Sequence, residues 1–212
     1  MKGDKIENQL VHLINKQIDK GPIIYSENTI FPSSCKIPID YEIYSKKTFL
    51  NFYKNIIKHL KLGKKFDLKH QPDYIGSYLP RLNTNIHGWI NWDLKSYQVE
   101  RFIDAFDDPY PGASTMINNK VVRIKKVFLS GGESNSHPFM SGLIFRHDRR
   151  WLCVNSVDNN VFLIKEVLNS KGKNIISDLK VGDRFYTPTN KLENKYVRVK
   201  YNSKGIINSS KK

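Results

Sequence analysis

Apolar residues recur at helical spacing in the first half of the chain. Between Lys47 and Leu62 they stand three and four positions apart, which is typical of one face of an amphipathic helix. These positions are Phe49, Phe52, Tyr53, Ile56, Ile57 and Leu60. Gly63 follows, where a glycine often ends a helix. A second helix is predicted from Asp93, as its capping residue, to about Phe106.

Weaker patterns occupy the N-terminal region and the middle of the chain. Residues 6–14 mix apolar and polar positions and predict a short strand or a helix end, whereas residues 22–25 predict a strand end after a Gly-Pro turn. Residues 26–40 are rich in Ser, Pro and Asn and predict a loop. Residues 64–92 lack a helical period and contain Pro and Gly at intervals, which indicates a crossing segment or linker.

After Pro111 the pattern changes to short apolar runs separated by turn residues. The runs that are typical of strands are residues 121–129, 142–146, 151–155, 161–167 and 184–187. Strands spaced by roughly ten residues, with Asn, Asp and Gly between them, indicate a small β-barrel. The polar tail from Asn202 is expected to fray.

The charge of the chain permits two interpretations. Lys and Arg total 35 against 20 Asp and Glu, which gives a formal net charge of +15. Lys outnumbers Arg by 27 to 8, and the lysines are scattered apart from a few adjacent pairs. A solvated basic surface explains this distribution, and so does a footprint for a polyanion. Arg would be favoured over Lys in a protein that reads bases.

Several classes of protein and of site are excluded. The content of 39% hydrophobic residues is too high for a disordered chain, and no run of about 18 apolar residues predicts a membrane span. The N-terminus lacks the apolar core of a signal peptide. Cys35 and Cys153 are the only cysteines, so a reducing compartment, the cytoplasm, is expected. The six histidines do not match metal-ligand spacing, and no metal is expected.

Candidate chemistry is sparse. The adjacent carboxylates Asp107 and Asp108 precede two prolines, and we interpret them as a turn device rather than an acid–base pair. Asp19 stands before a Gly-Pro turn, where a helix cap or an Asx turn is the ordinary interpretation. The alternative is a carboxylate on a loop at a sheet edge, where it could hold a proton from a reacting amine or orient a histidine.

Four segments, taken in order, resemble a known family. IDKGPII resembles a D-x-G-x-I loop, YLPRL and INW resemble Y-x-x-[KR]-L and I-[DN]-W stretches, and AFDDPYPGAST resembles a helix end followed by a Pro-Gly-Ala turn. GDRFYTP follows them. The chain is similar over residues 8–193 to the later part of a formyltransferase, in the family of methionyl-tRNA formyltransferase and the nucleotide-sugar N-formyltransferases.

The resemblance implies a fold and a site. The fold is an α/β remnant of a Rossmann-like formyltransferase domain followed by a small OB-like β-barrel domain. The implied activity is transfer of a formyl group from 10-formyltetrahydrofolate to a primary amine. Asp19 matches the catalytic Asp of the family, and Gln17, Ile18 and Asp19 lie in the loop that lines the folate. The family also uses an Asn as an oxyanion donor and a His.

The chain departs from the family at its N-terminal side. The catalytic Asn and His of the family stand well before this Asp, and nothing in residues 1–18 matches them. His12 matches a strand position, and a structural role is expected for it. Only part of the folate pocket is therefore expected. The resemblance implies residues 1–75 as the C-terminal part of the catalytic domain, 76–92 as a linker, 93–195 as the OB-like domain and 196–212 as a flexible tail.

Three functions stay open at this stage. The chain is the C-terminal portion of a formyltransferase, a non-catalytic module that binds the acceptor, or a half-enzyme that needs a separate N-terminal partner. An amino-sugar nucleotide and initiator methionyl-tRNA are near-equal acceptors, and residues 130–150 are the candidate acceptor-facing loop. A tRNA interface would depend steeply on salt.

Overall fold

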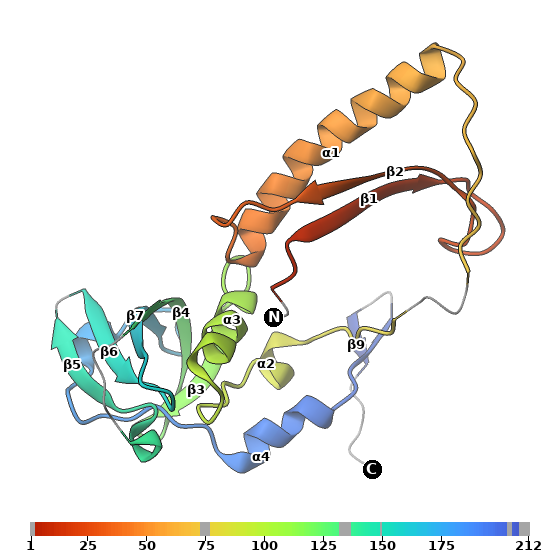
Figure 1. The fold of residues 1–212 in the computed structure, drawn as a ribbon. Coiled ribbons are helices and arrows are strands. Elements are labelled where there is room, and N and C mark those ends of the chain that lie inside the picture. Colours follow the sequence, from red (N-terminus) through yellow and green to blue (C-terminus); the bar gives the residue numbers. More distant parts are fainter. Residues whose placement is uncertain (1–2, 73–76, 132–136, 149, 203–204, 208–212) are drawn as a thin grey trace. The chain divides into compact units, whose positions relative to one another are not determined.

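The chain forms two compact units. The computed structural model describes residues 3–72, 77–131, 137–148, 150–202 and 205–207. One unit, here the N-terminal unit, spans residues 3–79, and the other, the C-terminal unit, spans residues 80–212 (Figure 1). No helix in these described ranges is long and apolar enough to cross a membrane.

The N-terminal unit is a two-stranded sheet with one long helix along it (Figure 1). Strand β1 (Ile6–His12) pairs antiparallel with β2 (Ile23–Ile30), and helix α1 spans Pro38–Lys61. The helix buries Phe52 and Ile56. Gly63 has φ +65, which fits the predicted helix end.

The prediction of a loop over residues 26–40 is wrong at both ends, because regular structure extends into this range from each side. Strand β2 continues to Ile30 because every residue from Tyr25 onward has a partner on β1. Helix α1 begins at Pro38 because the Asp40 carboxylate accepts hydrogen bonds from the backbone amides of Lys36 (3.0 Å) and Ile37 (3.1 Å). The end of β2 and the start of α1 depend on strand pairing and side-chain capping, and the spacing of hydrophobic residues does not indicate either.

The C-terminal unit is organised around one antiparallel sheet of five strands in the order β3-β4-β7-β6-β5. The strands are β3 (Ala113–Ile117), β4 (Lys120–Ser130), β5 (Ile144–Asp148), β6 (Trp151–Asn155) and β7 (Val161–Leu168). The strands predicted at 121–129, 151–155 and 161–167 are confirmed. The run at 142–146 becomes a strand only from Ile144 onward.

The five strands form an open sheet, and no closed barrel is found among the described residues. The run at 184–187 is not a strand but makes one bridge to each side: Tyr186 pairs with Met116 of β3, and Arg184 pairs with Leu143 before β5. Gly142 has φ +78, and an added Cβ would lie 2.2 Å from the carbonyl oxygen of Phe185. The close approach of these two backbones therefore requires glycine.

Helix α3 (Ser96–Ala105) packs against this sheet, and its start differs from the prediction. Asp93 does not begin the helix. Instead the amide and hydroxyl of Ser96 each donate to the Asp158 carboxylate at 3.0 Å. Partial burial alone would raise the pKa of Asp158, but hydrogen bonds from Ser96, Ser156 and Asn160 outweigh it and hold that pKa below its usual value.

The core of the C-terminal unit lies between α3 and the sheet. Trp92 is 6% exposed, stacks on Phe185 with ring centroids 5.6 Å apart, and donates its indole N–H to Thr115 at 2.9 Å. The buried aliphatic side chains around it include Ile90, Val99, Ile103, Ile124, Ile144, Leu152 and Ile164.

Short elements complete this unit. They are α2 (Thr84–His87), α4 (Thr189–Leu192), β8 (Lys200–Asn202) and β9 (Gly205–Ile207), with 3-10 turns at Pro138–Met140, Ile176–Asp178 and Glu193–Tyr196. Strands β8 and β9 pair with each other within the segment that the sequence predicts as a tail. Parts of the predicted acceptor-facing loop, residues 132–136 and 149, lie outside the described residues.

Candidate functional site

The predicted site residues lie in the connection between β1 and β2, residues 13–22, here called the Asp19 loop. The loop closes at its base, where the amide of Leu13 donates to the carbonyl oxygen of Pro22 at 3.0 Å. Gly21 is buried at this point, and an added Cβ would lie 1.6 Å from the carbonyl oxygen of Leu13. Only glycine allows the two sides of the loop to approach so closely.

Asp19 projects from the loop into solvent. Its φ is +57, a left-handed conformation that Asp tolerates better than most residues. Its side chain is 86% exposed, and one carboxylate oxygen lies 3.6 Å from Nε2 of His12. Within the described residues the Asp19 carboxylate caps no backbone amide. The geometry therefore favours an accessible carboxylate next to a histidine over a local cap.

His12 has a second contact that orients its ring. Its Nδ1 lies 3.1 Å from the carbonyl oxygen of Leu13, which can only accept, so Nδ1 carries a proton; Nε2 faces Asp19 and pairs with it when the ring carries a second proton. The structural role that the sequence predicts for His12 does not include this pairing. The two residues meet because the last residue of one strand and a loop residue before the next strand come close in a hairpin.

Gln71 holds the backbone of the Asp19 loop from outside it. Its Nε2 donates to the carbonyl oxygens of Asp19 (3.0 Å) and Gly21 (2.7 Å). The segment that carries Gln71 is itself fixed, because Ile23 and Lys69 exchange two backbone hydrogen bonds of 2.8 and 2.9 Å. No local sequence signal indicates this clamp, since 52 residues separate Gln71 from Asp19.

Gln17 and Ile18, the other predicted folate-lining residues, lie at the tip of the same loop. The amide of Gln17 donates to the side chain of Asn15 at 2.9 Å, which makes a tight turn there. Ile18 is 91% exposed and Ile14 is 96% exposed. The tip of the loop therefore presents two apolar side chains to solvent beside a local turn.

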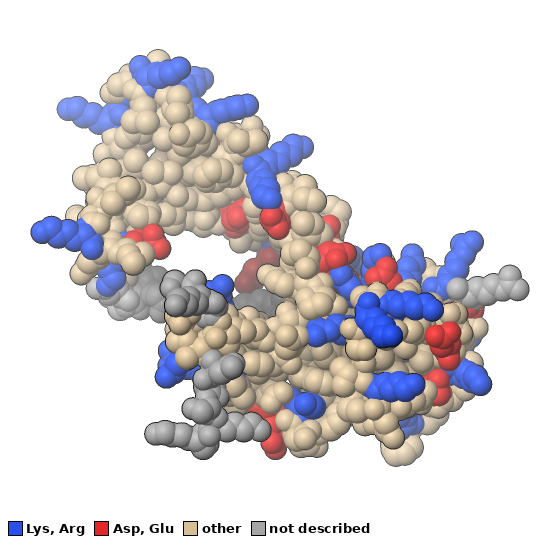
Figure 2. Space-filling model, turned by 180° about the vertical axis from the view of Figure 1, so that it is seen from behind, with Lys and Arg blue, Asp and Glu red and all other residues tan. Residues whose placement is uncertain are grey.

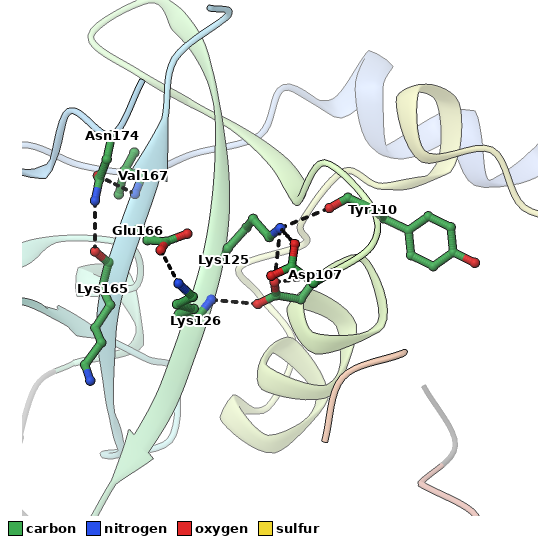
Figure 3. A network of polar contacts seen from close by, with 9 residues as sticks. Asp107, Tyr110, Lys125, Lys126, Lys165, Glu166, Val167 and Asn174 are labelled. Atoms are coloured by element: carbon green, nitrogen blue, oxygen red, sulfur yellow. Dashed lines mark hydrogen bonds and ion pairs between the residues drawn. The ribbon is translucent and has the colours of Figure 1, made fainter. Parts of the chain in front are cut away.

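A buried polar network fixes the Pro-Gly-Ala turn of the C-terminal unit (Figure 3). Asp107 is 0% exposed and accepts hydrogen bonds from the amides of Asp108 (2.7 Å) and Lys126 (2.8 Å). The Lys125 ammonium lies 3.3 Å from Asp107, pairs with Asp108 and donates to the carbonyl oxygen of Tyr110 at 3.1 Å. As the sequence predicts, the paired carboxylates form a turn.

The edge of this network is exposed to solvent. Lys126 pairs with Glu166 of β7, and the hydrogen bond between them raises the pKa of Lys126 above its usual value (Figure 3). Asn174 accepts from the amide of Val167 at 3.1 Å and donates to the carbonyl oxygen of Lys165 at 3.3 Å. The charged side chains of Asp107, Lys125 and Lys126 all have partners within the network, which fits a structural role.

Positive charge is distributed over both units. Figure 2 shows Lys and Arg side chains scattered across the visible face rather than gathered in one block. Among the residues that the structure describes, no three His, Cys, Asp or Glu side chains are grouped as metal ligands would be. The Asp19 loop is therefore the strongest candidate for a reactive site.

Sequence comparison supports the family that these segments resemble. Residues 84–180 match the family described as formyl transferase, C-terminal domain. A methionyl-tRNA formyltransferase from Wigglesworthia glossinidia brevipalpis is 26% identical over 184 residues, which cover 81% of this chain and 51% of that protein. The chain spans about half the length of this curated relative. The predicted resemblance is confirmed: residues 84–180 match the C-terminal domain of formyl transferases, and most of the chain is similar to a methionyl-tRNA formyltransferase.

Solved structures share the fold at low identity. HypX from Aquifex aeolicus, in complex with tetrahydrofolic acid, has a TM-score of 0.58 at 16% identity and covers 82% of this chain and 29% of its own. An N-formyltransferase from Helicobacter canadensis, with folinic acid and dTDP-3-aminofucose, has a TM-score of 0.55 at 18% identity, covering 76% of this chain and 56% of its own. The sugar 3N-formyl transferase WlaRD has a TM-score of 0.53 at 18% identity over 77% of this chain and 56% of its own.

Proposed function

We propose that the chain takes part in formyl transfer from 10-formyltetrahydrofolate to a primary amine. The observation that carries this proposal is the Asp19 loop, which presents an exposed carboxylate beside His12 at the position where the family motif has its catalytic Asp. The donor supplies the formyl group. Asp19 accepts the proton that the amine loses as its nitrogen bonds to the formyl carbon, and that proton is returned as the donor nitrogen is released.

His12 assists as a positioning residue. Its Nε2 faces the Asp19 carboxylate at 3.6 Å and limits where that carboxylate can lie. Gln17, Ile18 and the backbone of Asp19 form one wall of the donor pocket. We propose residues 1–75 as the C-terminal part of a Rossmann-like catalytic domain, 76–92 as a linker, 93–195 as an OB-like domain and 196–212 as a tail. The free thiols of Cys35 and Cys153 suit a cytoplasmic location.

Nothing in residues 1–18 matches the Asn and His that the family uses, and in this proposal another layer of protein supplies them. One face of the β1–β2 sheet supports such a partner. Ile6 pairs across the strands with Ile30, and these side chains are 65% and 69% exposed. The other face is packed, since Gln9 is buried and hydrogen-bonds Thr48 of α1 at 2.8 Å. An exposed cross-strand apolar pair is a surface that another layer would cover.

The acceptor is an amino-sugar nucleotide or initiator methionyl-tRNA. The Wigglesworthia relative supports the tRNA, and the structures with dTDP sugars support the nucleotide. The alternative functions are a non-catalytic acceptor-binding module and a half-enzyme with a separate N-terminal partner.

The test uses the protein captured from its source with an antibody against residues 93–195. Its intact mass and any co-purifying chain are recorded, and formyl transfer from 10-formyltetrahydrofolate is assayed with methionyl-tRNA and with a dTDP-amino sugar. Transfer to one acceptor supports the proposal. An intact mass above 24.7 kDa, or a second chain that co-purifies, would identify the protein segment that carries the Asn and His of the family. Acceptor binding without transfer supports the binding module. If neither acceptor binding nor formyl transfer is observed, both the formyl-transfer proposal and the binding-module alternative are refuted.

A further inference from the structure

A cavity of about 320 Å³ lies in the N-terminal unit, between β2 and the segment that follows α1. Its volume is at the lower end of the range of about 300–1,000 Å³ for small-molecule sites. The residues used below are Tyr25, His59, Lys64, Lys65, Phe66 and Lys69. It is separate from the Asp19 loop and is not used by the proposed reaction.

One part of the cavity is aromatic and anchored to the core. The His59 ring meets the Tyr25 ring edge-on, with centroids 5.4 Å apart and an interplanar angle of 89°. The Phe66 ring lies 6.4 Å from His59. Tyr25 in turn contacts Phe52, which is 2% exposed, at a centroid distance of 5.4 Å. This wall is therefore fixed by the core and offers aromatic surface on which a flat ring can pack.

Another part of the cavity is basic. Lys64, Lys65 and Lys69 line it, and Asp67 is the single carboxylate among its lining residues. None of the three lysines forms an ion pair with a described residue. Three ammonium groups that pair with no carboxylate among the described residues attract an anion to this opening, and a phosphate accepts hydrogen bonds from several of them at once.

The backbone around the cavity is fixed by hydrogen bonds. Gly63 reverses the chain after α1, and the amide of Lys64 donates to the carbonyl oxygen of His59 at 3.2 Å. At the other end of the segment, Lys69 and Ile23 exchange two backbone hydrogen bonds of 2.8 and 2.9 Å. The carbonyls at the end of α1 disfavour an anion, and the adjacent lysines offset that effect.

We propose that this cavity binds a mononucleotide. Its phosphate lies among Lys64, Lys65 and Lys69, and its base packs against Tyr25 and Phe66. A volume of about 320 Å³ is on the scale of a single mononucleotide. Lys69 stands two positions before Gln71, so a bound nucleotide also fixes the segment that clamps the Asp19 loop. The proposal does not depend on formyl transfer.

Calorimetric titration of the full chain with adenosine monophosphate tests the site. Adenosine, which lacks the phosphate, and inorganic phosphate, which lacks the base, are the matched probes. Adenosine monophosphate is expected to bind at least about tenfold more tightly than either, because both parts of the site contribute. Equal binding of adenosine monophosphate and inorganic phosphate, or no binding of the nucleotide, would overturn the proposal.

Charge reversal locates the binding. The Lys64→Glu/Lys65→Glu variant is expected to lose about tenfold or more in affinity, whereas Lys54→Glu on exposed α1 retains wild-type affinity. Thermal unfolding checks that both variants fold, and Lys64→Ala/Lys65→Ala replaces the first if it does not. Bound nucleotide should also slow amide exchange at residues 69–71. If the folded cavity variants bind adenosine monophosphate with wild-type affinity, the assignment of the site to this cavity is wrong.

Discussion

Gln71 donates two hydrogen bonds to the loop that presents Asp19, one to the carbonyl oxygen of Asp19 itself at 3.0 Å and one to that of Gly21 at 2.7 Å. The Asp19 carboxylate is 86% exposed, so neighbouring side chains do not pack it in place. Apart from the contact with His12, its position depends on the backbone that carries it. Gln71 therefore sets the geometry of the candidate site without touching the carboxylate.

Removing this clamp is expected to loosen the loop. The Gln71→Ala variant should lose about 1–2 kcal/mol of unfolding free energy in the N-terminal unit, because each net hydrogen bond contributes about 0.5–1.5 kcal/mol. Amide exchange should accelerate at residues 13–22 and stay unchanged in the middle of α1. Asn55→Ala, on the exposed side of α1, is the control. Unchanged amide exchange in the loop would mean that the hydrogen bond between Leu13 and Pro22 is enough to hold the loop without Gln71.

A methyl group at Gly21 should disrupt the same loop. The added Cβ would lie 1.6 Å from the Leu13 carbonyl oxygen, so the backbone must move. Gly21→Ala is expected to cost about 2–3 kcal/mol, as overpacking of a tight contact does. At Gly131 the nearest atom to an added Cβ is 3.8 Å away, so Gly131→Ala should be close to neutral. Urea unfolding of both variants measures the difference, and equal stability would contradict the close approach of Leu13 and Gly21.

Asp19 should be essential to turnover in the native assembly. Asp19→Asn keeps the size of the side chain but cannot take a proton, and kcat is expected to fall about 10²–10⁴-fold. His12→Gln should reduce kcat less, because His12 acts through Asp19. Asp4→Asn, which changes an exposed carboxylate outside the loop, is the control. Near-normal turnover of a folded Asp19→Asn variant would reject the catalytic role.

Two adjacent lysines allow a matched test of the polar network in the C-terminal unit. The Lys125 side chain is 8% exposed and faces buried Asp107, whereas the Lys126 side chain is 48% exposed and pairs with Glu166. Lys125→Met leaves a buried carboxylate without its cation and should cost about 3–5 kcal/mol. Lys126→Met removes a surface pair worth about 0–1 kcal/mol. Similar losses, measured by urea unfolding, would refute the distinction.

The sequence predicts those features that depend on local pattern. The period from Lys47 to Leu62 identifies most of α1, and alternation with turn residues identifies β4, β6 and β7. The loop carrying Asp19 is found through a motif. Features set by distant residues are missed: Asp158 rather than Asp93 bonds the first turn of α3, and Gln71 clamps the loop. Their partners lie 62 and 52 positions away in the sequence, and neither hydrophobic spacing nor secondary-structure propensity predicts contacts over such separations.

The bond between Asp158 and Ser96 makes the C-terminal unit sensitive to acid. Since the folded-state pKa of Asp158 lies below its ordinary value of 3.8, the ionised carboxylate stabilises the fold. This contribution is complete above that ordinary value and is lost as the pH falls through the lower, folded-state pKa. Asp158→Asn should therefore cost about 1 kcal/mol near pH 7, the usual contribution of a helix cap.

The same variant should show a smaller difference in strong acid. Below the folded-state pKa the wild-type carboxyl is protonated and resembles the amide of Asp158→Asn, so the two unfolding free energies should converge. Urea unfolding at pH 7 and at successively lower pH measures this convergence. Asp148→Asn, at the exposed turn between β5 and β6, serves as the comparison, since that change leaves α3 intact. A wild-type advantage over Asp158→Asn that stays constant into strong acid would show that the charge of Asp158 does not stabilise α3.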